Sequence, residues 1–269
     1  MIPAVVTAIM LLAALSLHEG AHLLVGSYLG GRFEKIRPFP LGLAAKIKNP
    51  DELDPWERYV TYGAGALANG TMAFWGFAVS HISYVGVTWL ERFAFYNLAL
   101  AVFNLLPMLP LDGGRMLQQF LANRLGMLRA DRLLRWLGLA LSLFLILLGL
   151  LQIILFYYNF TIFLAGVYIW RWNKKNRPAQ KVEFFRWMAT KQTKLRRMPI
   201  KRPKIEPTTT LSKALEKLRL DYYTAFRVNG ATISETELLK HVLENGLAGE
   251  VGDLLKPSEA LPPTPPPAF

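Results

Sequence analysis

The sequence predicts an α-helical polytopic membrane protein with a small C-terminal α/β domain. Three observations carry this prediction. Hydrophobic side chains make up 52% of the 269 residues, and the mean hydropathy of the chain is positive, which is typical of membrane proteins. The apolar residues gather in five runs, each near the length that crosses a bilayer as a helix. The positive charge is concentrated in one segment that directly follows the last run.

The five apolar runs are the candidate membrane spans. About 20 helical residues cross about 30 Å of hydrocarbon. The runs that approach this length cover residues 2–28, 58–80, 91–111, 134–153 and 155–172. The last two are close neighbours, so they predict either a helical hairpin or one long kinked helix. Residues 1–15 also allow a secretory signal peptide, but no basic residue precedes them, which disfavours that alternative.

The loops between the runs predict the orientation in the membrane. Residues 171–204 hold thirteen Lys and Arg and one acid, which equals the +12 net charge of the whole chain. The 112–133 loop holds four arginines, whereas the 81–90 loop has no Lys or Arg. Basic loops stay on the cytoplasmic side, so we expect an integral membrane protein with a cytoplasmic C-terminus. The basic segment predicts contact with anionic lipids, and no nucleic-acid partner is expected.

Two histidines and a glutamate lie inside the first run, in SLHEGAHLLVG at 16–26. His18 and His22 are spaced i, i+4, which places both imidazoles on one face of a helix. Glu19 lies about 100° around the helix, where its carboxylate reaches a metal-bound water. This H-E-x-x-H pattern is typical of zinc hydrolases, in which the glutamate accepts a proton from that water. A pair of satisfied core histidines is disfavoured, because an unpaired carboxylate in lipid is costly.

A third protein ligand is needed, and Asp112 is the candidate. The chain has no cysteine, so histidines and carboxylates must supply every ligand. Asp112 lies in NLLPMLPLDGGR at 104–115 and is the only carboxylate between Glu91 and Asp131. The first and third runs both run inward in the predicted topology. We therefore expect Asp112 at a depth similar to that of the two histidines.

The segment around Asp112 is also predicted to leave the helical conformation. Two prolines precede it and two glycines follow it, at Pro107, Pro110, Gly113 and Gly114. Proline removes a backbone donor and glycine permits unusual backbone. Irregular backbone at membrane depth must be buried or line a wet cavity, which a hydrolase needs for its water. The alternative is a kinked helix end with Asp112 as the N-cap of the next helix.

HEGAH in the first run, followed some ninety residues later by NLLPMLPLDGG, resembles the site-2 protease family of intramembrane zinc metalloproteases. The resemblance covers roughly residues 1–172. It implies zinc as cofactor, a general base, three metal ligands and two substrate-positioning residues: Glu19; His18, His22 and Asp112; Asn104 and Pro110. GAGALANG at 63–70 resembles the Gly-Pro-x-x-x-Asn element of the family, with Ala66 in place of the proline. Gly65 and Asn69 carry over, and Asn69 is assigned to substrate binding.

The C-terminal residues predict a small α/β unit at 205–256. The expected elements are a helix at 210–220, short strands around 222–233 separated by Asn229-Gly230, and a helix at 234–245. This unit resembles a single CBS domain, a module that usually works in pairs and often binds adenosine nucleotides. The resemblance implies ATP or a related nucleotide as ligand, and homodimerisation or docking on a partner. A generic small α/β domain is the alternative.

Four domains follow from these boundaries. They are a transmembrane metalloprotease domain, a basic cytoplasmic linker, the CBS-like regulatory domain and a Pro-rich disordered tail, at 1–172, 173–204, 205–256 and 257–269. This organisation is similar to the sporulation branch of the family, whose protease removes an inhibitory pro-sequence from a sigma factor in endospore-forming bacteria. That branch implies a bacterial sporulation membrane, a pro-sigma substrate, and membrane inhibitor and scaffold proteins. It also has an additional span before its H-E-x-x-H helix, so this chain either is truncated or lacks that span.

Two further expectations concern the substrate and the competing function. A helical substrate must unwind to expose its carbonyls, and residues 41–48 are predicted to offer a strand edge to which it adds. Residues 37–40 are read as a bend between short extended pieces. The alternative function is a metal-binding membrane scaffold or transporter without proteolytic activity. Transport is disfavoured because, apart from Asn69 and Asn104, the outer halves of the runs offer few polar residues.

Overall fold

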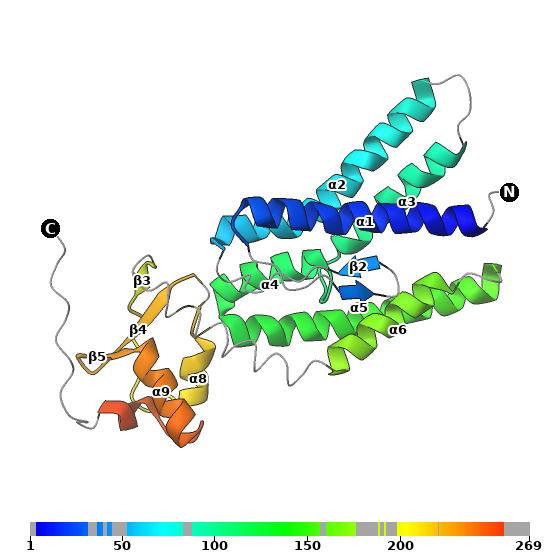
Figure 1. Cartoon of the computed structure of the whole chain (residues 1–269). Coiled ribbons are helices and arrows are strands. Elements are labelled where there is room, and N and C mark those ends of the chain that lie inside the picture. Colours follow the sequence, from blue (N-terminus) through cyan, green and yellow to red (C-terminus); the bar gives the residue numbers. More distant parts are fainter. Residues whose placement is uncertain are drawn as a thin grey trace.

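The chain is described here by a computed structural model that is mostly helical, with a small sheet near the C-terminus (Figure 1). The described residues are 4–31, 37–39, 42–44, 53–82, 88–156, 160–175, 188, 191, 198–219 and 221–255. The helical class predicted from the apolar runs is therefore confirmed for this part of the chain.

Five helices fall on the five apolar runs. They are α1 (Ala4–Tyr28), α2 (Pro55–Ile82), α3 (Thr88–Asn104), α5 (Met127–Phe156) and α6 (Thr161–Lys175). Within the described residues, two segments are long and apolar enough to cross a bilayer, Val5–Tyr28 and Met127–Leu155. Helices α3 and α6 have 17 and 15 residues, fewer than the about 20 that a crossing needs. The topology of five crossings stays a prediction.

Helices α5 and α6 form an antiparallel hairpin. A Cβ added at Gly149 of α5 would lie 2.4 Å from the backbone nitrogen of Phe163, and one at Gly166 of α6 would lie 2.9 Å from Ile146. Residue numbers rise along one helix as they fall along the other, so the two helices run in opposite directions. Of the two arrangements that the sequence allows for these runs, the structure shows the hairpin.

Helix α3 ends at Asn104, which confirms that the segment before Asp112 leaves the helical conformation, although the apolar run itself continues to residue 111. Residues 105–111 form turns, and α4 (Asp112–Leu125) follows them. A Cβ at Gly113 would lie 2.2 Å from the Leu105 carbonyl oxygen, and one at Gly114 would lie 2.3 Å from the backbone of Met108. The two glycines are needed because the turn segment packs directly on the first turn of α4.

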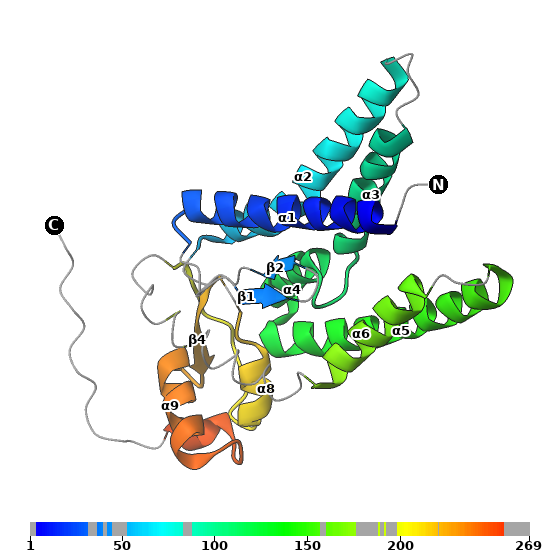
Figure 2. The same cartoon turned by 45° about the vertical axis from the view of Figure 1, so that its right-hand side comes forward.

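Two short strands lie between α1 and α5 in both views (Figures 1 and 2). Strand β1 (Arg37–Phe39) pairs antiparallel with β2 (Gly42–Ala44), with Pro38 opposite Leu43. The residues read as a bend at 37–40 are therefore extended over 37–39. Strand β2 falls inside the predicted substrate edge at 41–48, whose other residues lie outside the described part of the chain.

The C-terminal unit, residues 198–255, is a small sheet covered by helices. Its strands have the order β3-β4-β5, with β3 (Ile200–Lys201) parallel to β4 (Tyr223–Val228) and β5 (Ala231–Ser234) antiparallel to it. The helices are α8 (Leu211–Glu216), α9 (Glu235–Asn245) and a 3₁₀ turn, η3 (Val251–Leu255). The sheet begins at residue 200, inside the segment that composition assigns to the linker.

Local sequence signals explain the second half of this unit. Asn229 and Gly230 both have left-handed backbone, with φ of 47° and 88°, as the predicted two-residue hairpin turn requires. Ser234 accepts from the backbone of Glu237, whose carboxylate accepts in return from the backbone of Ser234. This capping box starts α9 one residue after the predicted position.

Candidate metal centre

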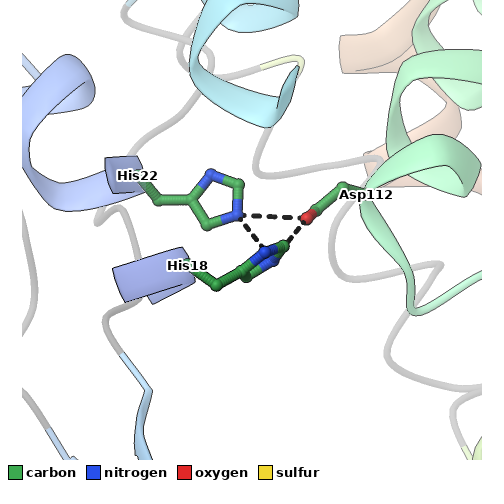
Figure 3. Close-up of side chains that lie close together, drawn as sticks. All are labelled: His18, His22 and Asp112. Carbon is green, nitrogen blue, oxygen red and sulfur yellow. Dashed lines mark hydrogen bonds and ion pairs between the residues drawn. The ribbon is translucent and has the colours of Figure 1, made fainter. Parts of the chain in front are cut away.

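Three side chains from two distant parts of the sequence converge on one point (Figure 3). His18 and His22 lie one turn apart on α1, and Asp112 is the first residue of α4. Asp112 Oδ2 lies 3.1 Å from His18 Nε2 and 3.0 Å from His22 Nε2, and the two Nε2 atoms lie 3.2 Å apart. The structure thus brings together the three residues that the sequence predicts as metal ligands. Leu111, not Asp112, occupies the N-cap position of α4.

A chain of buried amides fixes the far side of His18. Asn97 Nδ2 donates to the Phe93 carbonyl at 2.8 Å, which leaves Asn97 Oδ1 to accept from Asn69 Nδ2 at 2.7 Å. Asn69 Nδ2 also donates to the Ala14 carbonyl at 3.0 Å, so Asn69 Oδ1 faces His18 Nδ1 at 2.6 Å. An amide oxygen only accepts. His18 therefore carries its proton on Nδ1, and its Nε2 presents a lone pair to the centre.

His22 is oriented in the same way by backbone. Its Nδ1 lies 2.7 Å from the Thr61 carbonyl oxygen, which also only accepts. His22 therefore carries its proton on Nδ1 and turns the lone pair of Nε2 towards Asp112. Acceptors that hold the second nitrogen of a metal-binding histidine in this way are typical of zinc sites.

The converging atoms are suited to a cation. Two unprotonated ring nitrogens and an ionised carboxylate repel one another at 3.0–3.2 Å unless a positive charge lies between them. Zinc binds histidine nitrogen at about 2.0–2.1 Å in tetrahedral geometry, which separates its ligand atoms by about 3.3 Å. The donor set fits zinc, and three protein ligands leave a fourth position open, as in catalytic zinc sites.

Gly65 on α2 provides the space in front of the histidines. A Cβ at this position would lie 2.4 Å from His22 Nε2 and 2.7 Å from His18 Nε2. Real Cβ atoms do not approach other atoms this closely, so any larger residue here would have to displace both imidazoles. Gly65 matches a glycine of the family's Gly-Pro-x-x-x-Asn element, but the sequence does not indicate why a glycine is required there.

Glu19 lies between the two histidines on α1 and is partly buried. Its carboxylate interacts electrostatically with His22 and is not among the three converging ligand atoms. This placement is compatible with the predicted role as a general base, because the residue is near the centre without occupying a ligand position.

The predicted substrate residues lie in two different environments. Asn104 ends α3, where its Nδ2 donates to the Leu100 carbonyl at 3.0 Å, and Pro110 lies in the turn segment before Asp112. Both are partly exposed, and their substrate role stays a prediction. Asn69 is fully buried behind His18. This geometry places Asn69 against the outer nitrogen of a predicted metal ligand, and its substrate role stays a prediction.

Two residues that contact the site were missed by sequence reasoning. Thr61 acts through its backbone carbonyl, for which no side-chain pattern exists. Asn97 is fully buried. Its position inside an apolar run could have identified it, because a polar side chain there is costly without a hydrogen-bond partner. Pairing it with Asn69 required the packing of α2 on α3.

Comparisons with known proteins bear on this centre. Residues 82–148, which include Asp112, match the model of peptidase family M50. A solved site-2 protease from Methanocaldococcus jannaschii superposes with a TM-score of 0.52 at 28% identity, covering 65% of this chain and 79% of that one. Both matches indicate that this chain is similar to the site-2 protease family. The mostly helical architecture of the described residues agrees with this likeness.

Two relatives extend the match in sequence. A zinc metalloprotease of Methanocaldococcus jannaschii is 31% identical over 166 residues, which is 60% of this chain and 46% of that protein. Stage IV sporulation protein FB of Bacillus subtilis is 28% identical over 123 residues, which is 46% of this chain and 43% of that protein. The chain thus spans about half the length of the relatives it matches. Together these findings support a zinc-dependent membrane protease.

Proposed function

We propose that this chain is a zinc-dependent intramembrane endopeptidase that cleaves a membrane-associated protein near the cytoplasmic face. The observation that carries the proposal is the convergence of His18, His22 and Asp112 with both histidine tautomers fixed. The exposed leucines of α5, among them Leu143, Leu147 and Leu151, support a lipid environment. The similarity to zinc metalloproteases supports the reaction class.

Each residue of the centre has its own role in the proposed reaction. Zinc held by the three ligands would polarise a substrate carbonyl and acidify a bound water. Glu19 would accept a proton from the attacking water and pass it to the leaving amine. Asn69 and Thr61 hold the two imidazoles in place during these proton transfers. Asn104 and Pro110 are assigned to positioning the substrate, on their resemblance to residues of the family with that role.

The substrate is proposed to add as a strand to β2, the edge nearest α1. Proline cannot donate a backbone hydrogen bond and disrupts a strand edge. We expect Leu43→Pro to reduce cleavage at least about tenfold without changing the zinc content of the purified protein. Cleavage at the wild-type rate would rule out β2 as the docking edge.

The similarity to Stage IV sporulation protein FB supports a finer proposal. In this proposal the substrate is a pro-sigma factor, activated in a bacterial sporulation membrane under the control of membrane inhibitor and scaffold proteins. The C-terminus then lies in the cytoplasm with the basic linker against anionic lipids. The C-terminal unit is the surface through which a homodimer would form.

The test is co-expression of the full chain with a panel of membrane-associated substrates that includes a pro-sigma fusion. Wild type is compared with Glu19→Gln, which keeps the size of the side chain and removes the base. We expect a gel-shifted product only with wild type, a rate reduced at least about a hundredfold in the variant, and equal zinc content. Cleavage by the variant would overturn the role of Glu19. Stoichiometric zinc without any cleavage would favour the scaffold or transporter.

A regulatory ligand is proposed for the C-terminal unit. Its resemblance to a CBS domain supports weak binding of ATP or another adenosine nucleotide that adjusts activity. Titration calorimetry of the full chain with ATP should give saturable heat in the millimolar range, and the absence of heat there would count against nucleotide control. A variant truncated before residue 198 is the matched control for heat arising elsewhere in the chain.

A further inference from the structure

The C-terminal unit docks at the corner between α4 and α5 (Figure 2). Ala122 and Met127, from the two sides of that corner, share one hydrophobic core with Leu215 and Leu218 of the unit. A Cβ at Gly126 would lie 2.0 Å from the carbonyl oxygen of Glu216. The backbone of the corner and that of the unit are therefore in direct contact.

One carboxylate of the unit contacts the two helices α2 and α4 at once. Asp221 accepts from Arg58 Nη2 near the start of α2 and from Asn123 Nδ2 near the end of α4. Arg219 adds a hydrogen bond to the Asn123 carbonyl at 3.0 Å. The Arg58 and Asp221 side chains are 6% and 15% exposed. Removing one partner of such a desolvated ion pair strongly destabilises the arrangement, because the remaining charge loses its compensation.

Helix α2 connects this ion pair to the supports of the histidines. Thr61 follows Arg58 by one turn, and its carbonyl holds His22. Gly65 and Asn69 follow at further intervals of one turn, so all four residues lie along one face of the helix. Gly65 lies against both imidazoles and Asn69 holds His18. A displacement of Arg58 along the axis of α2 would therefore carry every one of these supports with it.

Helix α4 connects the same ion pair to the third ligand. Asp112 and Asn123 are eleven residues apart in one helix, about three turns, so they lie on the same face. Gln119 lies on this face too, and its Nε2 donates to the Pro55 carbonyl at the start of α2 at 2.7 Å. The register of α2 against α4 sets the distance between the imidazoles and the Asp112 carboxylate.

We infer that Asp221 of the C-terminal unit is a positioning residue for the metal centre, acting by clamping Arg58 of α2 to Asn123 of α4. Metal ligands must stay within about 0.5 Å of the productive geometry, so a small change in this register is enough to weaken the site. This role rests on the proposed function, since it requires the three ligands to hold zinc. Through this contact the C-terminal unit would change the geometry of the metal ligands by way of α2 and α4, without movement of α1.

A second contact of the unit supplies a matched control. Glu216 accepts from Arg129 at 2.9 Å and from Arg132 at 2.7 Å, both on α5. The hydrogen bond from Arg129, together with that from Arg132, holds the pKa of the Glu216 carboxyl below its usual range. In the described part of the chain, the residues that contact the metal ligands lie on α1, α2 and α4. Glu216→Gln therefore loosens the same unit without touching the clamp.

The experiment measures zinc affinity of the full chain in detergent by competition with a chromophoric chelator, and the visible spectrum of the cobalt-substituted protein. We expect Asp221→Ala to lower zinc affinity at least about tenfold and to shift the cobalt bands, because the ligand geometry changes. Glu216→Gln should stay within about twofold of wild type with an unchanged spectrum. Adding Arg58→Met to Asp221→Ala should leave the affinity as low as in Asp221→Ala, because the clamp is absent in both variants; recovery would mean that an unpaired buried charge caused the loss and would overturn the clamp.

The outcomes separate this role from the proposed function. If wild type binds no zinc, the proposed metalloprotease fails and the clamp with it. If wild type binds zinc and Asp221→Ala matches it in affinity and cobalt spectrum, only the clamp is overturned. Equal losses in Glu216→Gln and Asp221→Ala would mean that docking as a whole matters and would likewise overturn the specific role of Asp221.

Discussion

Gly65→Ala is expected to abolish zinc binding while leaving α2 intact. A Cβ at this position would lie 2.4 Å and 2.7 Å from the Nε2 atoms of His22 and His18, and a zinc ion bound to both lies about 2.0–2.1 Å from the same atoms. The methyl group would therefore clash with both ligand nitrogens and displace them from a common metal. Zinc affinity should fall at least about a hundredfold, measured by chelator competition on the purified full chain.

Gly63→Ala is the matched control for this substitution. Gly63 lies on the same helix, and a Cβ there would meet nothing within 4 Å. Alanine is a better helix former than glycine by about 1 kcal/mol, so Gly63→Ala should keep its zinc and melt at the wild-type temperature or slightly above it. Equal zinc in the Gly65 variant would show that the metal lies elsewhere in the centre than the geometry indicates.

The ligands of the centre were predictable because each one leaves a pattern in the sequence. The i, i+4 spacing of His18 and His22 places both on one helix face. The Glu19 carboxylate lies in an apolar run, where a charged group is costly and therefore indicates a functional site. Asp112 was reached by a different route, because the charges of the loops oriented the first and third runs in the same direction. The structure brings these residues within 3.0–3.2 Å of one another.

The surroundings of the centre were not predictable, because they depend on packing between helices. The Thr61 carbonyl belongs to the backbone, so no side-chain pattern indicates its role. Gly65 is needed because α2 packs closely on α1, and this packing is defined only by the fold. The non-helical segment before Asp112 was predicted from its prolines and glycines, whereas the exact end of α3 at Asn104 was not, since apolar residues continue to 111. The contacts of Asp221 with α2 and α4 join residues 163 and 98 positions apart, a separation that no local pattern spans.

Asn69→Leu is expected to lower zinc affinity about 10- to 100-fold, the usual cost of removing an outer partner of a metal ligand. Leucine has nearly the same size as asparagine but offers no acceptor to His18 Nδ1. A buried N–H without a partner is costly, so the neutral imidazole moves its proton to Nε2. That proton then points at Asp112 Oδ2, 3.1 Å away, and occupies the position of the metal. Competition with a chelator measures the loss.

Asn104→Leu distinguishes this effect from a general response to losing a membrane asparagine. The Asn104 amide donates to the Leu100 carbonyl of its own helix and takes no part in the chain from Asn97 to His18. We expect this variant to bind zinc as wild type does and to cleave the co-expressed substrate at least about tenfold more slowly. The two asparagines would then affect different quantities, metal affinity for Asn69 and turnover for Asn104. If Asn69→Leu kept its zinc and lost only cleavage, the substrate contact predicted from the sequence would be the correct role for Asn69.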